Sequence, residues 1–319
     1  MYITLVSFDN WGFNAYVAVA LEQRGHIVNH INFNEYKYKY PNYLYKIYNF
    51  LLKLLFKKNI KTVFFGKKII ENLKKNNTKQ DIILVIKGDY IDPKSILELK
   101  KYGNKTIGFF NDNTSRCPKI INAIPNFDEV FSFEKKDCEK YNLKFATNWI
   151  YASVPFSTEL TFTNKVFNII SEDKRFAILS KIAADLNAKK ISHKIFVYSK
   201  KNRKKTCSID YINKHIPLKE VNEYINSSQA LLDINRENQD GLTFRVFESI
   251  GLHKKLITTN TDIINYDFYN PNNILVIDKN NPDIDVSFFD KEYQQLSETI
   301  YKKYSLDGWL ENVIFNNLN

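Results

Sequence analysis

The 319-residue sequence predicts an α/β protein with two domains in tandem, each built on a parallel β-sheet. Three observations support this prediction. The length suits about two domains of roughly 150 residues each. Short apolar segments alternate with helix-like segments, as in parallel sheets covered by helices on both faces. A polar stretch with one proline, SVPFSTELTFTN (153–164), divides the alternation into two series and is typical of a linker. We therefore expect domains at 1–155 and 163–300, then a helix and tail at 301–319.

The first series opens with the apolar strand YITLVSF (2–8) and a turn rich in Asn and Gly. A helix at 15–25 follows, and Gly25 closes it because glycine readily adopts the conformation found just beyond a helix end. Further strands are expected at 26–33, 81–89, 105–112, 127–134 and 145–153. Further helices are expected in a Lys-rich segment before residue 81, at 92–103 with an acidic, proline-containing start, and at 135–143.

The second series has the same alternation. Strands are expected at 165–170, 193–201, 229–234, 255–260 and 273–278. Helices are expected after a polar start at 171–175, within 211–228, at 240–255 opened by Gly241, and at 290–304. The tail contains Trp309, and we expect the C-terminal helix to cross back onto the first domain.

Composition excludes several classes of protein. The three Cys (Cys117, Cys138, Cys207) form no CxxC pair, which argues against a disulfide scaffold or a thiolate zinc site and fits a reducing compartment. The five His show no ligand spacing, so no metal site is expected. The N-terminus does not resemble a signal peptide, and no apolar run is long enough for a membrane-spanning helix. We expect a cytoplasmic protein, with peripheral contact at the inner face of the cell membrane as one option.

Positive charge is concentrated in one segment. The net charge is +11, and residues 35–75 carry eleven Lys and two acids, a net charge of +9. A helix from about Tyr43 would present a broad apolar face beside a polar stripe that includes Lys46, Asn49 and Lys53. The segment is either a surface helix packed on its own domain or a patch that contacts anionic lipid or an acidic acceptor. Direct nucleic-acid binding is not expected, because no recognisable nucleic-acid-binding module surrounds the segment.

Two loops of the first domain are candidates for the acceptor side of a reaction, since ligands of parallel sheets bind beyond the carboxyl ends of strands. The loop at 7–14 offers Asp9, Asn10 and Asn14, which suit a hydroxyl-rich ligand or simply cap the next helix. The loop at 111–116 offers Asp112 as a general base and Arg116 as an acceptor contact, or is a hydrogen-bonded loop. Asp9 is the second candidate for the base.

Two loops of the second domain suit a phosphate-bearing ligand. After the strand at 165–170, Lys174 and Arg175 lie at a helix start, either as a diphosphate site or as part of a capping box. After the strand at 229–234, Gly241 permits close approach of a ligand, and the backbone N–H groups of Leu242, Thr243 and Phe244 lie at a positive helix end. Arg245 and Glu248, three residues apart, share a face of that helix, and they either contact the ligand or form a surface salt bridge.

Two acidic residues, Asp240 and Glu248, are separated by seven residues within DGLTFRVFESIGLHKKLITT. This pattern resembles the E-x7-E motif of GT-B-fold glycosyltransferases. The resemblance implies that Glu248 binds the nucleotide ribose, Asp240 contacts the donor sugar, and Lys174 and Arg175 face the diphosphate. Gln239, beside Asp240, is included with the donor-binding residues. The sequence departs from the motif at Asp240, which replaces Glu, and at 249–255, which replaces an Ala-rich tail. FRVFESIG followed by KKLITTN is similar to the CgeB-like and polysaccharide-biosynthesis branch.

The expectation is therefore an α/β protein of two Rossmann-like domains facing a cleft, of GT-B type. It would move a sugar from a nucleotide-sugar donor to a glycan or glycolipid acceptor of lipopolysaccharide or capsule type, with no metal or other cofactor. The Asp283-Ile284-Asp285 sequence resembles a metal-binding DxD motif but is expected to be a loop. Two alternatives stay open, a nucleotide-sugar epimerase of the same fold and a non-catalytic basic protein that binds membrane or nucleic acid. Inversion and retention at the anomeric carbon also stay open.

Overall fold

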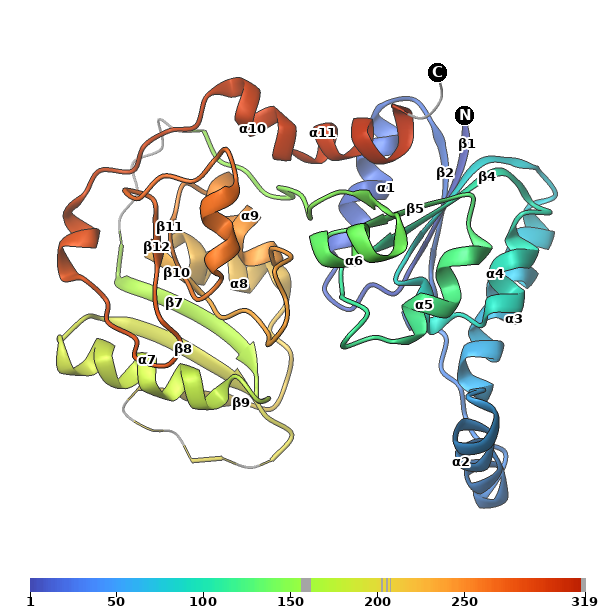
Figure 1. The fold of residues 1–319 in the computed structure, drawn as a ribbon, viewed down its shortest axis with the longest axis horizontal. Helices are drawn as coiled ribbons and strands as arrows, with labels where there is room; N and C mark the ends of the chain where they lie inside the picture. The colour runs from blue at the N-terminus through green and yellow to red at the C-terminus, as the bar shows by residue number, and fades with distance from the viewer. Residues whose placement is uncertain (156–161, 202, 205, 207, 317–319) are drawn as a thin grey trace. The chain divides into compact units, whose positions relative to one another are not determined.

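The computed structural model describes residues 1–155, 162–201, 203–204, 206 and 208–316. The chain forms two compact units (Figure 1). Unit 1 contains Met1–Thr147 together with the segment from Leu310 onward, and unit 2 contains Asn148–Trp309. Half of the expected linker, 156–161, lies outside the described residues, as does Cys207.

Unit 1 is built on a six-stranded parallel sheet in the order β2-β1-β3-β4-β5-β6. Its strands are β1 (Tyr2–Ser7), β2 (Ile27–Asn32), β3 (Gln80–Ile86), β4 (Gly103–Phe110), β5 (Glu129–Ser132) and β6 (Lys144–Phe145). The central strands β1 and β3 are buried along almost their whole length. This burial explains their continuous apolar sequence, which strands covered on both faces require.

The helices of unit 1 are α1 (Phe13–Gln23), α2 (Tyr43–Phe56), α3 (Ile60–Asn76), α4 (Pro93–Leu99), α5 (Lys119–Ala123) and α6 (Lys135–Tyr141). The acidic, proline-containing start of α4 is confirmed, because Asp92 accepts the backbone N–H of Ser95 at 3.2 Å and Pro93 begins the helix. Gly25 has a φ of +80° just beyond α1, as predicted from its place after the helix.

The second unit also has a six-stranded parallel sheet, in the order β12-β11-β10-β7-β8-β9. Its strands are β7 (Asn164–Ser171), β8 (His193–Tyr198), β9 (Asp210–Ile212), β10 (Ser228–Asp233), β11 (Lys255–Thr258) and β12 (Ile274–Val276). Its longer helices are α7 (Phe176–Ala188), α8 (Leu218–Asn226) and α9 (Phe244–Gly251). Apolar clusters on the two faces of this sheet form the core of the unit. Two parallel sheets with flanking helices confirm the predicted fold class.

The C-terminal segment contains α10 (Glu298–Tyr304), α11 (Leu306–Leu310) and a π-helical turn at Glu311–Phe315. From Leu310 onward it belongs to unit 1, where Glu311 forms an ion pair with Arg24 at 2.7 Å and Ile314 is fully buried. The Arg24 guanidinium also lies over the ring of Phe315. The prediction that the C-terminal helix crosses back is confirmed.

Several expected elements are shorter than predicted, including the last strand of the first series and the last helix of the second. The strand expected at 145–153 ends at Phe145. Beyond it, the Asn148 side chain donates to the carbonyl of Leu242, and the Trp149 ring is buried against Phe244 and Trp309. Of this segment, Ile150 forms an isolated bridge with Ser305, and no continuous strand follows Phe145. The helix expected at 290–304 begins only at Glu298, where Ser297 caps it.

Helix α2 begins at Tyr43 as predicted, but it does not pack its apolar face on unit 1. Leu44, Ile47, Leu51 and Leu55 are all exposed, and the one buried side chain of the helix is the polar Asn49. Figure 1 shows α2 beyond the end of α3, away from the unit 1 sheet. Of the two alternatives for this segment, the surface helix packed on its own domain is contradicted by this exposure.

None of the helices in the described part of the chain combines the length and apolar character that crossing a membrane requires.

Candidate functional site

Each sheet has one point at which the strand order reverses, and ligands of parallel sheets bind beyond the carboxyl ends of the strands at such points. The reversal lies between β1 and β3 in unit 1 and between β7 and β10 in unit 2. The loops that leave these strand pairs are therefore the first places to look for a site.

In unit 2, three charged side chains bring the two loops of the reversal together. Asp173, after β7, accepts hydrogen bonds from the Arg175 side chain, at 3.0 Å from Nε, and from Arg236, at 2.9 Å from Nη1. Arg175 also donates to the carbonyl of Ile234, after β10, at 3.0 Å. Although burial acts to raise the pKa of Asp173, the Arg175 hydrogen bonds and the Arg236 charge hold it below the usual range. The structure thus unites the two loops predicted in the second domain.

Arg236 was not singled out from the sequence. It lies in the polar loop INRENQD after β10, and its charge was visible there. Only the pairing of β10 with β7 places it beside Asp173.

The start of α9 is fixed by a buried carboxylate. Asp233, the last residue of β10, accepts the hydroxyls of Thr243 at 2.8 Å and Thr258 at 3.0 Å. Thr243 caps α9 by accepting the backbone N–H of Arg245 at 3.2 Å. Burial raises the pKa of Asp233, and the two hydroxyl bonds oppose that rise. The helix begins at Phe244 rather than at Gly241, but its positive end still lies at the reversal point.

Arg245 and Glu248 form the alternative ion pair, and it is buried rather than on the surface. Arg245 Nη1 lies 2.5 Å from Glu248 Oε2, and the Glu248 side chain is only 3% exposed. The Tyr151 hydroxyl donates to the other carboxylate oxygen of Glu248, and the Arg245 guanidinium lies over the Phe167 ring. Both oxygens of Glu248 therefore already have partners within unit 2.

The remaining predicted donor-side residues occupy different depths. Lys174 is exposed beside Arg175. Gln239 is buried and donates to the carbonyl of Gly241 at 3.0 Å. Leu242 is part of the apolar core, so only its backbone is suited to meet a polar ligand. Asp240 is half-buried, and its carbonyl accepts the Asn260 side chain at 3.0 Å.

In unit 2, a pocket of about 510 Å³ opens near the ends of β8 and β9. Basic side chains on its wall include Lys201, Arg203 and His215, and aromatic ones include Tyr211 and Tyr224. The His215 ring stacks on Tyr198 with centroids 4.5 Å apart. This pocket was not predicted from the sequence, because the short strand β9 on its wall lies in a segment expected to be a connection.

In unit 1, Asp9 has the contacts of a helix cap. One oxygen accepts the backbone N–H groups of Trp11 and Gly12, at 3.2 and 2.7 Å, and the other accepts those of Asn14 and Ala15, at 2.9 and 3.2 Å. This arrangement favours the capping interpretation of the loop over a role for Asp9 as a base. Gly12, with a φ of +85°, permits the tight turn around the carboxylate.

The other predicted residues of this loop separate. Asn10 is exposed, whereas the Asn14 side chain is buried in the first turn of α1. Asn10 is therefore accessible to a ligand in this structure, whereas Asn14 is enclosed by its own unit and is not.

Asp112 lies at the carboxyl end of β4, one strand beyond the reversal point. It pairs with Arg116, four residues later, and with Lys87 at 3.3 Å. Arg116 is also held by its backbone N–H, which donates to the Asn113 side chain at 2.9 Å. The structure thus brings the two predicted residues of this loop together.

Lys87 and Asp89, which follow β3 at the reversal point, were not singled out from the sequence. Burial raises the pKa of Asp89 to about 6, with the Lys87 charge opposing and the Asp112 charge adding to the rise. The adjacent Tyr90 stacks on Phe8 with ring centroids 4.3 Å apart, which links the loops after β1 and β3. The available signal was the KGD sequence directly after the most apolar strand.

Within the described residues, His, Cys, Asp and Glu side chains do not gather into a set of three or more that suits a metal ion. Asp283 pairs with Lys189, and Asp285 caps a short helical turn, as suits the loop expected there.

Sequence comparison finds no matching family model and no matching curated protein. Structure comparison finds a UDP-forming α,α-trehalose-phosphate synthase from Burkholderia xenovorans, with a TM-score of 0.57, 12% identity and 99% of each chain covered. It also finds a UDP-N-acetylglucosamine 2-epimerase from Rickettsia bellii, with a TM-score of 0.52, 12% identity, and 99% of this chain and 96% of the other covered. The likeness extends over both units, and the chain has two Rossmann-like domains of the GT-B fold.

Proposed function

We propose that this protein is a glycosyltransferase that moves a sugar from a nucleotide-sugar donor to a cell-surface glycan. The observation that carries the proposal is the arginine-rich edge at the reversal point of unit 2, where Arg175 and Arg236 meet beside the start of α9. Guanidinium groups and a helix N-terminus both favour a diphosphate. The fold shared with two enzymes whose names contain UDP supports the same ligand class.

The proposed chemistry is departure of the nucleoside diphosphate as the sugar transfers. The charge that develops on the diphosphate would be stabilised by Lys174, Arg175 and the positive end of α9, without a metal ion. Arg236, which is held beside Arg175 by its ion pair with Asp173, would add to this stabilisation. The aromatic and basic pocket near β8 and β9 has the chemistry to hold the nucleotide base. Asp240 remains the proposed contact to the donor sugar.

On the acceptor side, we assign the general base to Asp112 rather than to Asp9, because both oxygens of Asp9 are used in capping. Arg116 and Lys87 pair with the Asp112 carboxylate and would hold it in place close to an acceptor hydroxyl. The acceptor class is lipopolysaccharide or capsule glycan, and the site of action is the cytoplasm. This part of the proposal depends on the resemblance to the polysaccharide-biosynthesis branch.

The test is a titration of the full chain with UDP, GDP, CMP and dTDP, followed by melting temperature. A nucleotide that binds only the native state, at a free concentration about 100 times its dissociation constant, adds about 2.7 kcal/mol to the free energy of unfolding. It therefore raises the melting temperature. The absence of a shift with all four nucleotides would contradict the proposal. A positive result leads to a screen of the corresponding nucleotide sugars.

Three variants separate the possible roles of Glu248. If its carboxylate accepts a ribose hydroxyl in place of Tyr151, then Tyr151→Phe should keep nucleotide affinity and Glu248→Ala should lower it by about tenfold or more. If Glu248 only holds Arg245, both Glu248→Ala and Arg245→Ala should weaken binding to a similar degree. Unchanged affinity in Glu248→Ala would remove this residue from the donor site.

The second candidate is a nucleotide-sugar epimerase, which the likeness to the Rickettsia bellii enzyme favours. Incubation with donor alone distinguishes the two. An epimerase forms an epimer of the donor in the absence of any acceptor, whereas a transferase needs an acceptor hydroxyl or releases free sugar slowly to water.

A further inference from the structure

Helix α2 is attached to unit 1 through its polar side. The buried Asn49 side chain donates to the Tyr40 hydroxyl at 2.7 Å and accepts the backbone N–H of Ile60 at 2.9 Å. Asn49 shares its stripe with Lys46 and Lys53, which together take up roughly a third of the helix circumference. The apolar side of α2 is therefore directed away from the rest of unit 1.

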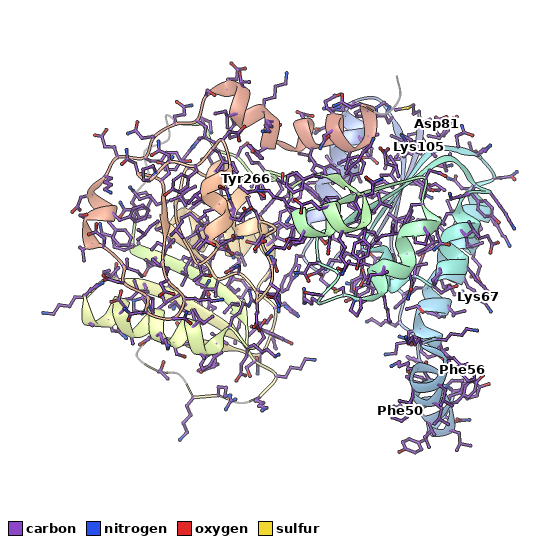
Figure 2. The ribbon with its side chains drawn as sticks, viewed as in Figure 1. Phe50, Phe56, Lys67, Asp81, Lys105 and Tyr266 are labelled. Atoms are coloured by element: carbon purple, nitrogen blue, oxygen red, sulfur yellow. The ribbon has the colours of Figure 1, made fainter. Side chains whose placement is uncertain are left out.

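That outward side is unusually apolar for a surface in contact with water. Ten of the fourteen side chains of α2 are apolar or aromatic and exposed, from 42% at Ile47 to 72% at Tyr43. Figure 2 shows Phe50 and Phe56 on this helix, below Lys67 of α3. Contiguous apolar surface of this kind marks an interaction site, because water does not favour its exposure.

The charge around α2 is of one sign. The sequence between Glu35 and Glu71 contains nine Lys and no Asp or Glu. Lys53 and Lys57 lie near the C-terminal end of α2, and Lys58 and Lys61 follow directly. A surface that combines exposed Leu, Phe and Tyr with lysines fits a bilayer interface containing anionic lipid.

The charge pattern also decides between possible occupants. Packing α2 against the α2 of a second copy would bring two lysine clusters together with no acidic residues from this stretch to compensate them. Fourteen residues are too few to span a bilayer, so the helix would lie in the plane of the interface. Tyrosine side chains, of which α2 has three, are suited to that depth because they combine an apolar ring with a polar hydroxyl.

We infer that α2 is a lipid-docking helix, which inserts its outward apolar side into the surface of an anionic bilayer while the flanking lysines contact lipid headgroups. Docking does not depend on the proposed sugar transfer. Failure of either hypothesis is therefore visible separately, because vesicle binding is measured without any nucleotide or sugar.

The experiment is co-sedimentation of the full chain with vesicles of phosphatidylcholine alone and with about 30% phosphatidylglycerol. We expect binding to the anionic vesicles, much weaker binding to the neutral ones, and loss of part of the affinity as salt rises from ~0.05 to ~0.5 M. Absence of binding to anionic vesicles would overturn the inference.

The double variant Leu51→Glu/Leu55→Glu tests the helix itself. Both side chains are exposed, so the fold should tolerate the change, and vesicle affinity should fall roughly tenfold or more. The matched control is Val19→Glu/Leu97→Glu, which introduces the same charges at exposed apolar positions elsewhere in unit 1. Equal binding by the two double variants would show that the lysines act without α2 and would contradict insertion.

Sedimentation velocity without lipid tests the competing occupant. A monomer is expected for both wild type and the double variant. A wild-type dimer that dissociates in Leu51→Glu/Leu55→Glu but not in the control would assign α2 to self-association and overturn the lipid assignment.

Discussion

At the scale of single residues, the carboxylates of this protein differ more in their partners than in their sequence surroundings. Asp9 and Asp112 follow apolar strands, and Asp233 is the last residue of one. Asp9 accepts backbone N–H groups, Asp112 pairs with two cations, and Asp233 accepts two threonine hydroxyls in a fully buried position. Only the second arrangement leaves a carboxylate that is paired with two cationic side chains while remaining partly accessible.

Asp233 is expected to be a positioning residue for the start of α9. Asp233→Ala leaves the hydroxyls of the half-buried Thr243 and the buried Thr258 without their acceptor, and it should lower the free energy of unfolding by roughly 1–3 kcal/mol. It should also reduce the nucleotide-induced shift in melting temperature, because the helix end that receives the diphosphate loses its anchor. Urea unfolding and the thermal shift measure the two effects.

Two further variants control this prediction. Asp233→Asn keeps an acceptor oxygen and should restore most of the thermal shift. Asp278→Ala removes an exposed carboxylate of the same unit and should change neither quantity appreciably. A normal thermal shift in Asp233→Ala would mean that Asp233 supports the fold without positioning the site.

At the scale of elements, some helix ends can be predicted from the residues at the end itself. Pro93 in the first turn of α4 and Gly25 beyond α1 were predicted from residue type, since their conformational preferences belong to the residues themselves. The absence of a continuous strand over 146–153 could not be predicted in the same way. It depends on Trp149 and its neighbours finding partners more than 90 residues away.

Helix α1 provides the test at this scale. Asp9→Ala removes the acceptor of four backbone N–H groups and should lower the free energy of unfolding by about 1–2 kcal/mol. Asp9→Asn should lose less, since its amide oxygen still caps. Glu22→Ala, at an exposed position of the same helix, is the matched control. Wild-type stability combined with loss of transfer activity in Asp9→Ala would return Asp9 to the role of base.

At the scale of the whole molecule, two buried lysines make stability depend on pH. Lys254 donates to the carbonyl of Asn226, Lys255 donates to those of Asn272 and Phe288, and burial lowers the pKa of each lysine to about 8. The unfolded chain keeps these protons up to about pH 10.4. Between about pH 8 and 10.4 the unfolded state therefore binds more protons, and this contribution to the free energy of unfolding rises with pH.

Lys254→Met isolates that contribution. Below pH 8 wild type bears the cost of a buried charge, which the variant lacks, so the stability of the variant relative to wild type should decrease from pH 7 to pH 10, by up to about 3 kcal/mol. Denaturant unfolding at several pH values measures the difference. Comparison with the variant is essential because burial raises the pKa of Cys117 and Cys138 to about 11, which opposes the rise above about pH 9. A difference that does not vary with pH would contradict the prediction.

The sequence by itself determined the two α/β series, the start of α2 and the concentration of charge around it, because hydrophobic periodicity and residue type act over a few neighbouring residues. Tertiary structure decided the rest. Strand order placed Arg236 beside Asp173 and brought Lys87 to Asp112, and long-range packing buried Glu248 against Tyr151. It also directed the apolar side of α2 outward, through the single buried amide of Asn49. These contacts join segments that are distant in sequence, so no local pattern specifies them.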